Sequence, residues 1–179
     1  MRKLVVTEFL TLDGVYQDDA QWQRAYNPDD GPFKREELWG SDALLLGRVT
    51  YEGFVRYWPT ATGDFADRMN ALPKYVPSTT LKNAGWNATV LNGDVAAKIQ
   101  DLKAQVGGNI LVYGSGTLAH WLLQRGLVDE LRLMIFPLVL GQGKRLFADG
   151  QRIPLHLAST RDMGDGVLLL TYTPDRERA

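Results

Sequence analysis

The chain contains no cysteine and only two histidines among its 179 residues. Without cysteine it can form no disulfide, no thiolate metal site and no cysteine nucleophile. The histidines, His120 and His156, lie far apart in the sequence, so their spacing predicts no zinc site of the closely spaced type. We expect neither histidine to take part in chemistry.

The sequence also lacks an excess of charge and a long apolar run. Its formal net charge is −1, which gives no general attraction to nucleic acid or to a membrane surface. No apolar stretch approaches a membrane span, which needs about 20 residues. The N-terminal segment 3–10 has the pattern of a strand rather than of a signal peptide. We therefore expect a cytoplasmic protein that binds neither nucleic acid nor membrane.

Strand and helix patterns alternate along the chain, whose length is that of one domain over residues 1–179. The predicted strands are 3–10, 42–46, 74–77, 86–91, 110–113 and 129–140, and the predicted helices are 33–39, 50–58, 65–71, 95–106 and 117–125. Strands 155–162 and 167–173 follow, joined by Gly164-Asp165-Gly166. This order predicts an α/β fold with a mixed, mostly parallel central sheet, flanking helices and an antiparallel C-terminal hairpin.

The most informative stretch runs from Val112 to Leu118 and reads VYGSGTL. It places a tight glycine turn between a buried strand and a helix, where backbone N–H groups and the helix dipole favour an anion. The full dinucleotide fingerprint is absent, because the third glycine and the acidic residue about 20 positions later are missing. A Gly-x-Gly pair alone is more often an ordinary turn than a phosphate site.

Three predicted strands end in small, hydroxyl or charged residues: Gly47-Arg48-Val49-Thr50, Ser78-Thr79-Thr80 and Gly114-Ser115-Gly116. Ligands of open α/β sheets collect at the carboxyl ends of parallel strands. Arg48 at a helix start opposes the helix dipole, so its position favours an anion beside it. Each feature also has a simpler explanation, namely a turn at Gly47, a helix cap at Thr50, a solvated Arg48 and a polar loop at 78–80.

Taken in order, these motifs resemble the dihydrofolate reductase-like superfamily, in particular the riboflavin-biosynthesis pyrimidine reductases, or RibD C-terminal type domains. The matching segments span nearly the whole chain: Thr11-Leu-Asp-Gly14, Leu44 to Glu52, Val76 to Leu81, Ile110 to Leu118, Leu127 to Leu131, Pro137 to Gly143 and Leu146-Phe147. The resemblance implies a three-layer reductase fold, NADPH as cofactor and a homodimer. The predicted strand 129–140 is long and apolar enough to pack across such an interface.

The resemblance also implies roles for individual residues. Gly47, Arg48 and Thr50 would hold the phosphate end of NADPH, and Ser78 and Thr79 would face its 2′-phosphate. The pyrophosphate would be wrapped by the following turn: Gly114, Ser115, Gly116, Thr117 and Leu118. Backbone around Thr7 and the loop from Leu12 to Val15 would contact the nicotinamide, and the Gly114–Ser115 bond would be cis.

The sequence departs from these relatives in places that concern the substrate. No unique acidic residue in segment 29–36 matches the acid of folate reductases, so folate is not expected as the substrate. A fused deaminase domain with zinc ligands is absent, which weakens the case for riboflavin synthesis. Lys144 and Arg145 are the candidates for binding a ribose phosphate on the substrate.

The predicted reaction moves a hydride from NADPH to a polarised C=O or C=N carbon of a small heterocycle or carbonyl compound. Asp13 is the first candidate proton donor, although Asp-Gly is also a routine turn, and Glu8 is the second, although it could simply face an edge. Trp22 and Tyr26 could cover the substrate or only anchor the long segment 16–32.

Two other functions remain open at this point. One is a nucleotide-binding sensor or interaction module that has lost catalysis, which the loosely assigned proton donor favours. The other is an α/β domain that binds no nucleotide and whose strand-end motifs are structural.

Overall fold

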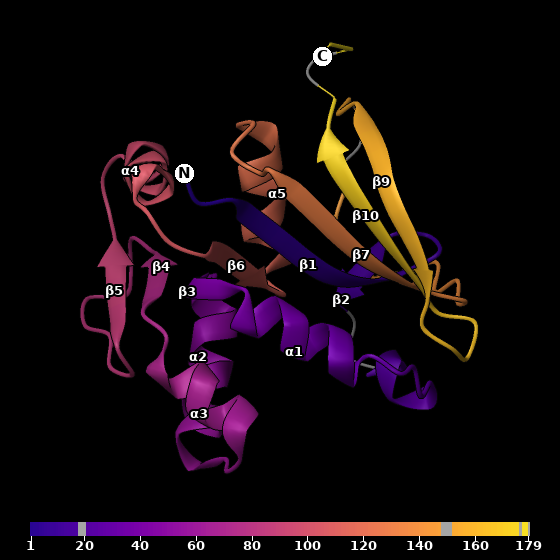
Figure 1. Ribbon diagram of the computed structural model, residues 1–179, viewed down its shortest axis with the longest axis horizontal. Helices are drawn as coiled ribbons and strands as arrows, with labels where there is room; N and C mark the ends of the chain where they lie inside the picture. Colours follow the sequence, from indigo (N-terminus) through magenta and orange to yellow (C-terminus); the bar gives the residue numbers. More distant parts are fainter. Residues whose placement is uncertain (18–20, 148–151, 176, 179) are drawn as a thin grey trace. The chain divides into compact units, whose positions relative to one another are not determined.

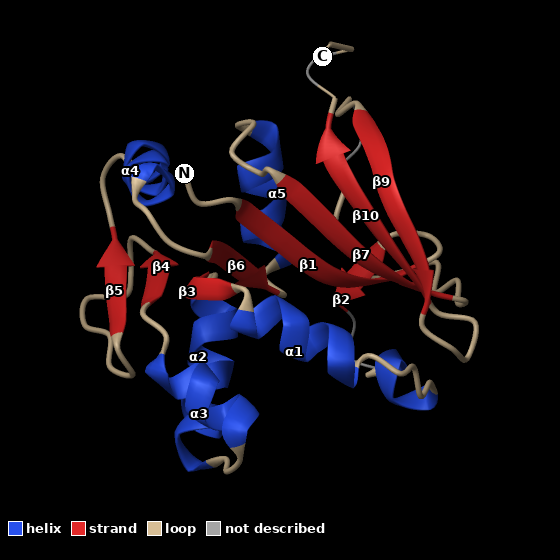
Figure 2. Cartoon of the chain, in the orientation of Figure 1, coloured by secondary structure: helices blue, strands red, loops and turns tan. Residues whose placement is uncertain are grey.

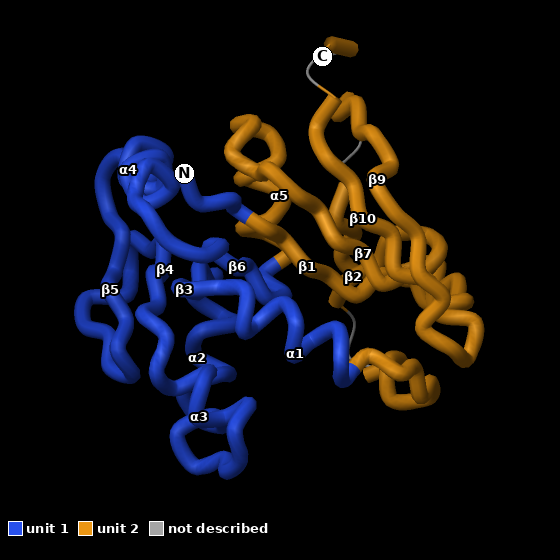
Figure 3. Tube along the Cα trace, in the orientation of Figure 1, with its two compact units in different colours: residues 1–4, 31–115 blue, residues 5–30, 116–179 orange. Residues whose placement is uncertain are grey.

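The computed structural model describes residues 1–17, 21–147, 152–175 and 177–178. Its elements form two units, which Figure 3 distinguishes by colour. Unit 1 consists of Met1–Leu4 and Gly31–Ser115, and unit 2 of Val5–Asp30 and Gly116–Ala179. The chain therefore passes from one unit to the other inside the predicted glycine turn.

Unit 1 is built on four parallel strands in the order β5-β4-β3-β6. Its strands are β3 (Ser41–Leu45), β4 (Lys74–Pro77), β5 (Ala88–Leu91) and β6 (Asn109–Tyr113). Its α-helices, labelled in Figure 1, are α1 (Gly31–Trp39), α2 (Arg48–Tyr57), α3 (Asp64–Ala71) and α4 (Val95–Ala104). The 3-10 helix η2 (Trp58–Thr60) follows α2.

The central strands of unit 1 form because their sequences are apolar on both faces. All residues from Ala43 to Leu46 and from Ile110 to Val112 are fully buried. Such continuous apolar runs are typical of parallel strands covered on both sides. Helix α4 begins where predicted, because the Asp94 carboxylate caps it by accepting the N–H of Ala97 at 3.0 Å.

Unit 2 combines parallel and antiparallel strands in the order β1-β7-β10-β9. The strands are β1 (Leu4–Thr11), β7 (Glu130–Phe136), β9 (Leu155–Asp162) and β10 (Leu168–Pro174). β1 and β7 are parallel, whereas β10 runs antiparallel to both β7 and β9. Figure 2 shows β9 and β10 as two long adjacent strands. They are the predicted C-terminal hairpin, and its turn contains Gly164, Asp165 and Gly166 in the left-handed region.

Four smaller elements complete the described part of unit 2. Strand β2 (Val15–Gln17) pairs with β8 (Lys144–Arg145) in a separate two-stranded sheet. The 3-10 helix η1 (Trp22–Ala25) precedes α1, and α5 (Gly116–Gln124) follows the glycine turn. These elements carry most of the residues of unit 2 that the sequence marks as functional.

The predicted strand 129–140 is too long. Strand β7 ends at Phe136, because Pro137 follows and the N–H of Leu138 turns back to the carbonyl of Phe136 at 2.7 Å. The chain then leaves the sheet, and the Leu138 carbonyl accepts the N–H of Leu12 at 2.8 Å. The predicted fold class is otherwise confirmed, with a mixed, mostly parallel strand arrangement, flanking helices and an antiparallel hairpin. No helix in the described ranges is long and apolar enough to cross a membrane.

Candidate functional site

The three predicted strand ends are neighbours in unit 1. Ser78 follows β4, Gly47 lies beyond β3 and Gly114 follows β6, and these strands are adjacent and parallel. Parallel neighbours end at the same edge of a sheet, so the three segments share one edge. This edge is the place where ligands bind in open α/β sheets.

Ser115 joins two of these segments through its hydroxyl group. Its Oγ accepts the N–H of Gly47 at 3.0 Å and donates to Oγ1 of Thr50 at 2.8 Å. Gly47 is the N-cap of α2 and Thr50 lies in its first turn. One hydroxyl group therefore fixes the glycine turn against the start of α2.

The turn at Gly114 is made by backbone dihedrals rather than by a cis bond. The structure has no cis peptide bond among the described residues, so the cis Gly114–Ser115 prediction is wrong. Instead, Gly114 has φ 54° and Ser115 has φ 68°. A left-handed conformation is uncommon for a residue with a side chain. The bonds of the Ser115 hydroxyl hold it there.

Arg48 has a partner on its own helix. Its Nη1 donates to the two carboxylate oxygens of Glu52 at 2.7 and 2.9 Å. This pair offsets the unfavourable position of a cation at a helix start, so an anion is not required to explain Arg48. Both side chains are more than a third exposed, and exposed ion pairs are weak. The guanidinium can therefore exchange Glu52 for a stronger anion at little cost.

Ser78 organises its own loop. Its Oγ accepts the N–H of Leu81 at 2.9 Å and that of Thr80 at 3.2 Å, while its own N–H donates to the carbonyl of Leu91 at 3.1 Å. This geometry supports the simpler explanation of a polar turn. Thr79 next to it is exposed.

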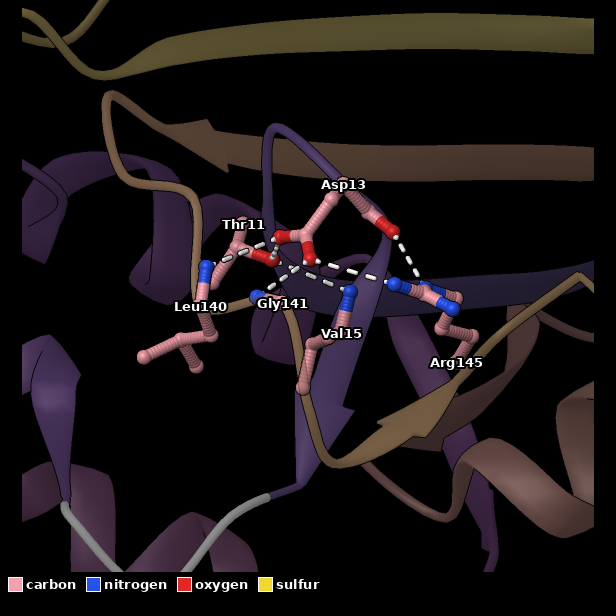
Figure 4. A network of polar contacts seen from close by, with 6 residues as sticks. All are labelled: Thr11, Asp13, Val15, Leu140, Gly141 and Arg145. Carbon is pink, nitrogen blue, oxygen red and sulfur yellow. Dashed lines mark hydrogen bonds and ion pairs between the residues drawn. The ribbon is translucent and has the colours of Figure 1, made fainter.

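In unit 2, Asp13 is the centre of a hydrogen-bond network (Figure 4). Its Oδ1 accepts the hydroxyl of Thr11 at 2.6 Å and the N–H of Leu140 at 3.2 Å. Its Oδ2 accepts the N–H of Gly141 at 2.9 Å. Arg145 adds a bond from Nε to the Asp13 carbonyl at 3.0 Å. The network ties the loop after β1 to the segment after β7, two motifs that lie far apart in the sequence.

This network sets the ionisation of Asp13. The hydroxyl of Thr11 and the backbone N–H groups of Gly141 and Leu140 hold the pKa of the carboxyl well below its usual range, and partial burial opposes them only in part. A carboxylate that stays ionised at neutral pH has no proton to donate. The geometry therefore favours a structural role for Asp13 over the predicted role as proton donor.

Glu8 and Thr7, the other predicted residues of β1, are both buried. Glu8 is 4% exposed and pairs in register with Leu133, while Thr7 is 2% exposed and pairs with Arg132. The structure thus places Glu8 inside the protein, away from an open edge. Its role as a proton donor stays a prediction.

Trp22 and Tyr26 both pack edge-to-face on Phe136, with ring centroids 5.0 and 5.5 Å away. The Tyr26 hydroxyl also donates to the carbonyl of Pro137 at 3.4 Å. Trp22 is only 5% exposed. These contacts favour the alternative that the two rings anchor the long segment to the end of β7, and Phe136 is the partner that the sequence did not reveal.

Tyr16 is a second residue that the sequence analysis missed. Its hydroxyl lies 3.2 Å from Oγ1 of Thr117, and its ring covers Gly116, the first residue of α5. A Cβ at Gly116 would fall 2.5 Å from three atoms of that ring, so a larger residue there requires the ring of Tyr16 to move. Leu118 and Val15, two other predicted residues nearby in the sequence, are buried.

The two basic residues proposed for a substrate phosphate lie in β8 and are exposed. Arg145 is engaged with Asp13, and Lys144 Nζ reaches Oε1 of Gln17 at 3.4 Å. His120 Nδ1 lies 3.2 Å from the carbonyl oxygen of Leu146. The described residues contain no cluster of three or more His, Asp or Glu that could hold a metal ion.

Comparison with known proteins shows the family of the chain. The family model of the RibD C-terminal domain matches residues 2–169. The chain belongs to this family. Among its relatives is the uncharacterized protein YyaP of Bacillus subtilis (strain 168), which is 31% identical over 180 residues, covering 96% of this chain and 94% of YyaP.

Solved structures with a similar fold are also known for this RibD C-terminal domain. A Shewanella sp. PV-4 protein with a provisional assignment to riboflavin biosynthesis matches with a TM-score of 0.80 at 22% identity, covering 97% of this chain and 99% of its own. A pyrimidine reductase-like protein of Corynebacterium diphtheriae matches with a TM-score of 0.73 at 15% identity, covering 98% and 92%. The predicted reductase fold is confirmed.

Proposed function

We propose that this RibD C-terminal domain protein is an NADPH-dependent reductase. It transfers a hydride to a small heterocyclic substrate, pyrimidine-like or pteridine-like, or to a carbonyl compound, in a reaction related to that of 5-amino-6-(5-phosphoribosylamino)uracil reductase. One observation carries the proposal. In a chain of this family, Ser115 fastens the glycine turn to the start of α2 at the shared edge of three parallel strands.

The residues at this edge fit the phosphate groups of a nucleotide. The first turn of α2 has N–H groups without partners inside the helix, and Arg48 adds a guanidinium held only by an exposed pair. In unit 1 the cofactor ligands would be the predicted set: Gly47, Arg48, Thr50, Ser78, Thr79, Gly114 and Ser115. The predicted cofactor ligands that lie in unit 2 are Gly116, Thr117 and Leu118 in the first turn of α5, Thr7 in β1 and Val15 in β2.

NADPH, when bound, supplies the hydride. The protein then has to bind the cofactor and the substrate, orient them and exclude water. The Asp13 network serves orientation, because it fixes the loop after β1 to the segment after β7. Glu8 remains the candidate for supplying a proton. Trp22 and Tyr26, packed on Phe136, would form the wall beside the substrate, and Lys144 and Arg145 would bind a phosphate on it.

Calorimetric titration with NADPH and NADH tests the cofactor first. NADPH-selective binding supports the proposal, and absence of binding by either nucleotide would leave the strand-end motifs as scaffold. Oxidation of NADPH in the presence of pyrimidines, pteridines or quinoid compounds then tests catalysis. A Glu8→Gln variant that keeps NADPH binding and full turnover would exclude Glu8 as the proton source.

A catalytically inactive nucleotide sensor is the second candidate. The observation that favours it is the hydrogen-bond network around Asp13, which lowers the pKa of the carboxyl and so disfavours the first candidate proton donor. A sensor binds NADPH without oxidising it in the presence of any substrate of these classes. We also propose a homodimer, for which light scattering at the mass of two chains is the expected result.

A further inference from the structure

Tyr16 lies at the weakest point of a small sheet. The ladder between β2 and β8 pairs Val15 with Arg145 and Gln17 with Lys144, and its register shifts between these two pairs, at Tyr16. The strands have three and two residues, so few backbone bonds hold them. An irregularity of this kind re-aims a side chain and loosens the local ladder.

The ring of Tyr16 fills the space that glycine leaves open at the start of α5. A Cβ on Gly116 would come within 2.5 Å of Cε1, Cε2 and Cζ alike, so the hydroxyl-bearing end of the ring faces the glycine. Gly116 is buried although it begins a helix of nine residues. Glycine lets another group approach the backbone at position 116 closely, and in this structure that group is the ring of Tyr16.

The contact that holds the ring of Tyr16 is weak enough to break and form again. Apart from the packing on Gly116, its polar anchor is the 3.2 Å contact between the Tyr16 and Thr117 hydroxyl groups, which is exposed. Water can replace either partner of an exposed hydroxyl pair, so little is lost when the ring moves. Tyr16 is itself only partly buried.

We infer that Tyr16 is a gate over the first turn of α5, which must swing away before a phosphate group can contact that turn. The inference rests on the proposed function, since it takes the anion to be the pyrophosphate of NADPH. In the closed state the ring and the phosphate compete for the same backbone. The apparent affinity is then the intrinsic affinity reduced by the fraction of open protein.

Removal of the ring should therefore tighten binding, whereas removal of an ordinary ligand contact would weaken it. The test is calorimetric titration of the wild type, Tyr16→Ala and Tyr16→Phe with inorganic pyrophosphate and with NADPH. Tyr16→Ala is expected to bind both about 3–10-fold more tightly, and Tyr16→Phe, which loses only the Thr117 contact, to fall between. Tyr57→Ala, which removes an exposed tyrosine of α2, is the matched control and should not tighten binding.

Unchanged or weaker pyrophosphate binding by Tyr16→Ala overturns the gate. If no variant binds NADPH, the proposed function fails, and the gate is judged on pyrophosphate alone. A Gly116→Ala substitution gives an independent check by thermal unfolding. It should destabilise the wild type somewhat more than Tyr16→Ala, because in the wild type the added methyl group has to displace the ring; equal losses in both backgrounds would contradict the contact.

Discussion

The hydroxyl of Ser115 lies 2.8 Å from that of Thr50 and, through the same oxygen, holds the N–H of Gly47 at 3.0 Å. Residues 65 positions apart are thereby locked together at the end of β6. Ser115 keeps a left-handed backbone to make these bonds. A strained residue in such a position is typical of functional sites.

Replacement of Ser115 by alanine should destabilise the protein by about 1–3 kcal/mol, because the N–H of Gly47 loses its acceptor while the strained backbone remains. Ser115→Gly loses the same bonds but relieves the strain, so it should be less destabilised. Urea unfolding of both variants measures the difference. Identical losses would show that the left-handed backbone stores no strain.

Arg48→Ala should weaken the binding of NADPH far more than that of NADH, if the guanidinium faces the 2′-phosphate. Stability should change by no more than about 0.5 kcal/mol, because the pair with Glu52 is exposed. Glu52→Gln is the matched control, since it frees the guanidinium without removing it. Equal losses for the two nucleotides in Arg48→Ala would refute the assignment.

Asp13→Asn should destabilise the protein at neutral pH, because the amide cannot accept all the bonds that the carboxylate accepts. The pKa of Asp13 is depressed in the folded protein, so its contribution is present above the ordinary value of 3.8 and is lost as the pH falls toward the folded value. The stability gap between wild type and variant should therefore narrow below pH 3.8. Denaturant unfolding from pH 7 to pH 2 measures it, and a gap independent of pH would contradict this role.

Lys74 is fully buried at the start of β4, with Nζ 2.9 Å from the Asn70 carbonyl and 4.0 Å from the centre of the Trp86 ring. Burial lowers the pKa of Lys74 from 10.5 to about 8. Between these values the unfolded chain binds a proton that the folded protein has released, so the free energy of unfolding should rise with pH.

Lys74→Met removes this titration while filling the same space. The stability of the wild type relative to Lys74→Met should increase from pH 8 to pH 10.5, as followed by urea unfolding. An exposed lysine such as Lys98, replaced in the same way, controls for the general effect of lost charge. A constant difference across this range would mean that Lys74 titrates normally.

Local sequence patterns predicted most of the elements, because the apolar runs of β3 and β6 and the Asp94 cap act over a few residues. They also pointed to three strand ends that the structure places at one edge of the sheet, and their role as a site stays a prediction. The hydrogen-bond partners of the individual residues could not be predicted from the sequence. Asp13 meets Gly141 and Tyr16 meets Thr117 across more than a hundred positions, and no spacing rule covers such pairs.

Two predictions were wrong, namely the length of β7 and the cis Gly114–Ser115 bond. The early end of β7 follows from Pro137 and from a turn whose carbonyl serves Leu12, a distant partner. The trans glycine turn follows from the hydroxyl of Ser115, which supports a left-handed residue by contacts with Gly47 and Thr50. Tertiary partners support the left-handed turn, whereas Pro137 was a local signal for the end of β7 that the sequence already contained.

The ring of Tyr16 closes over glycine at position 116, and a larger residue there would hold the ring away. The two positions should therefore covary among relatives. Chains with a small residue at position 16 are free to carry alanine or serine at 116, whereas chains that keep the aromatic residue should favour glycine. A mutational scan of residue 116 in wild-type and Tyr16→Ala backgrounds would reveal the same dependence as a change in the residues tolerated.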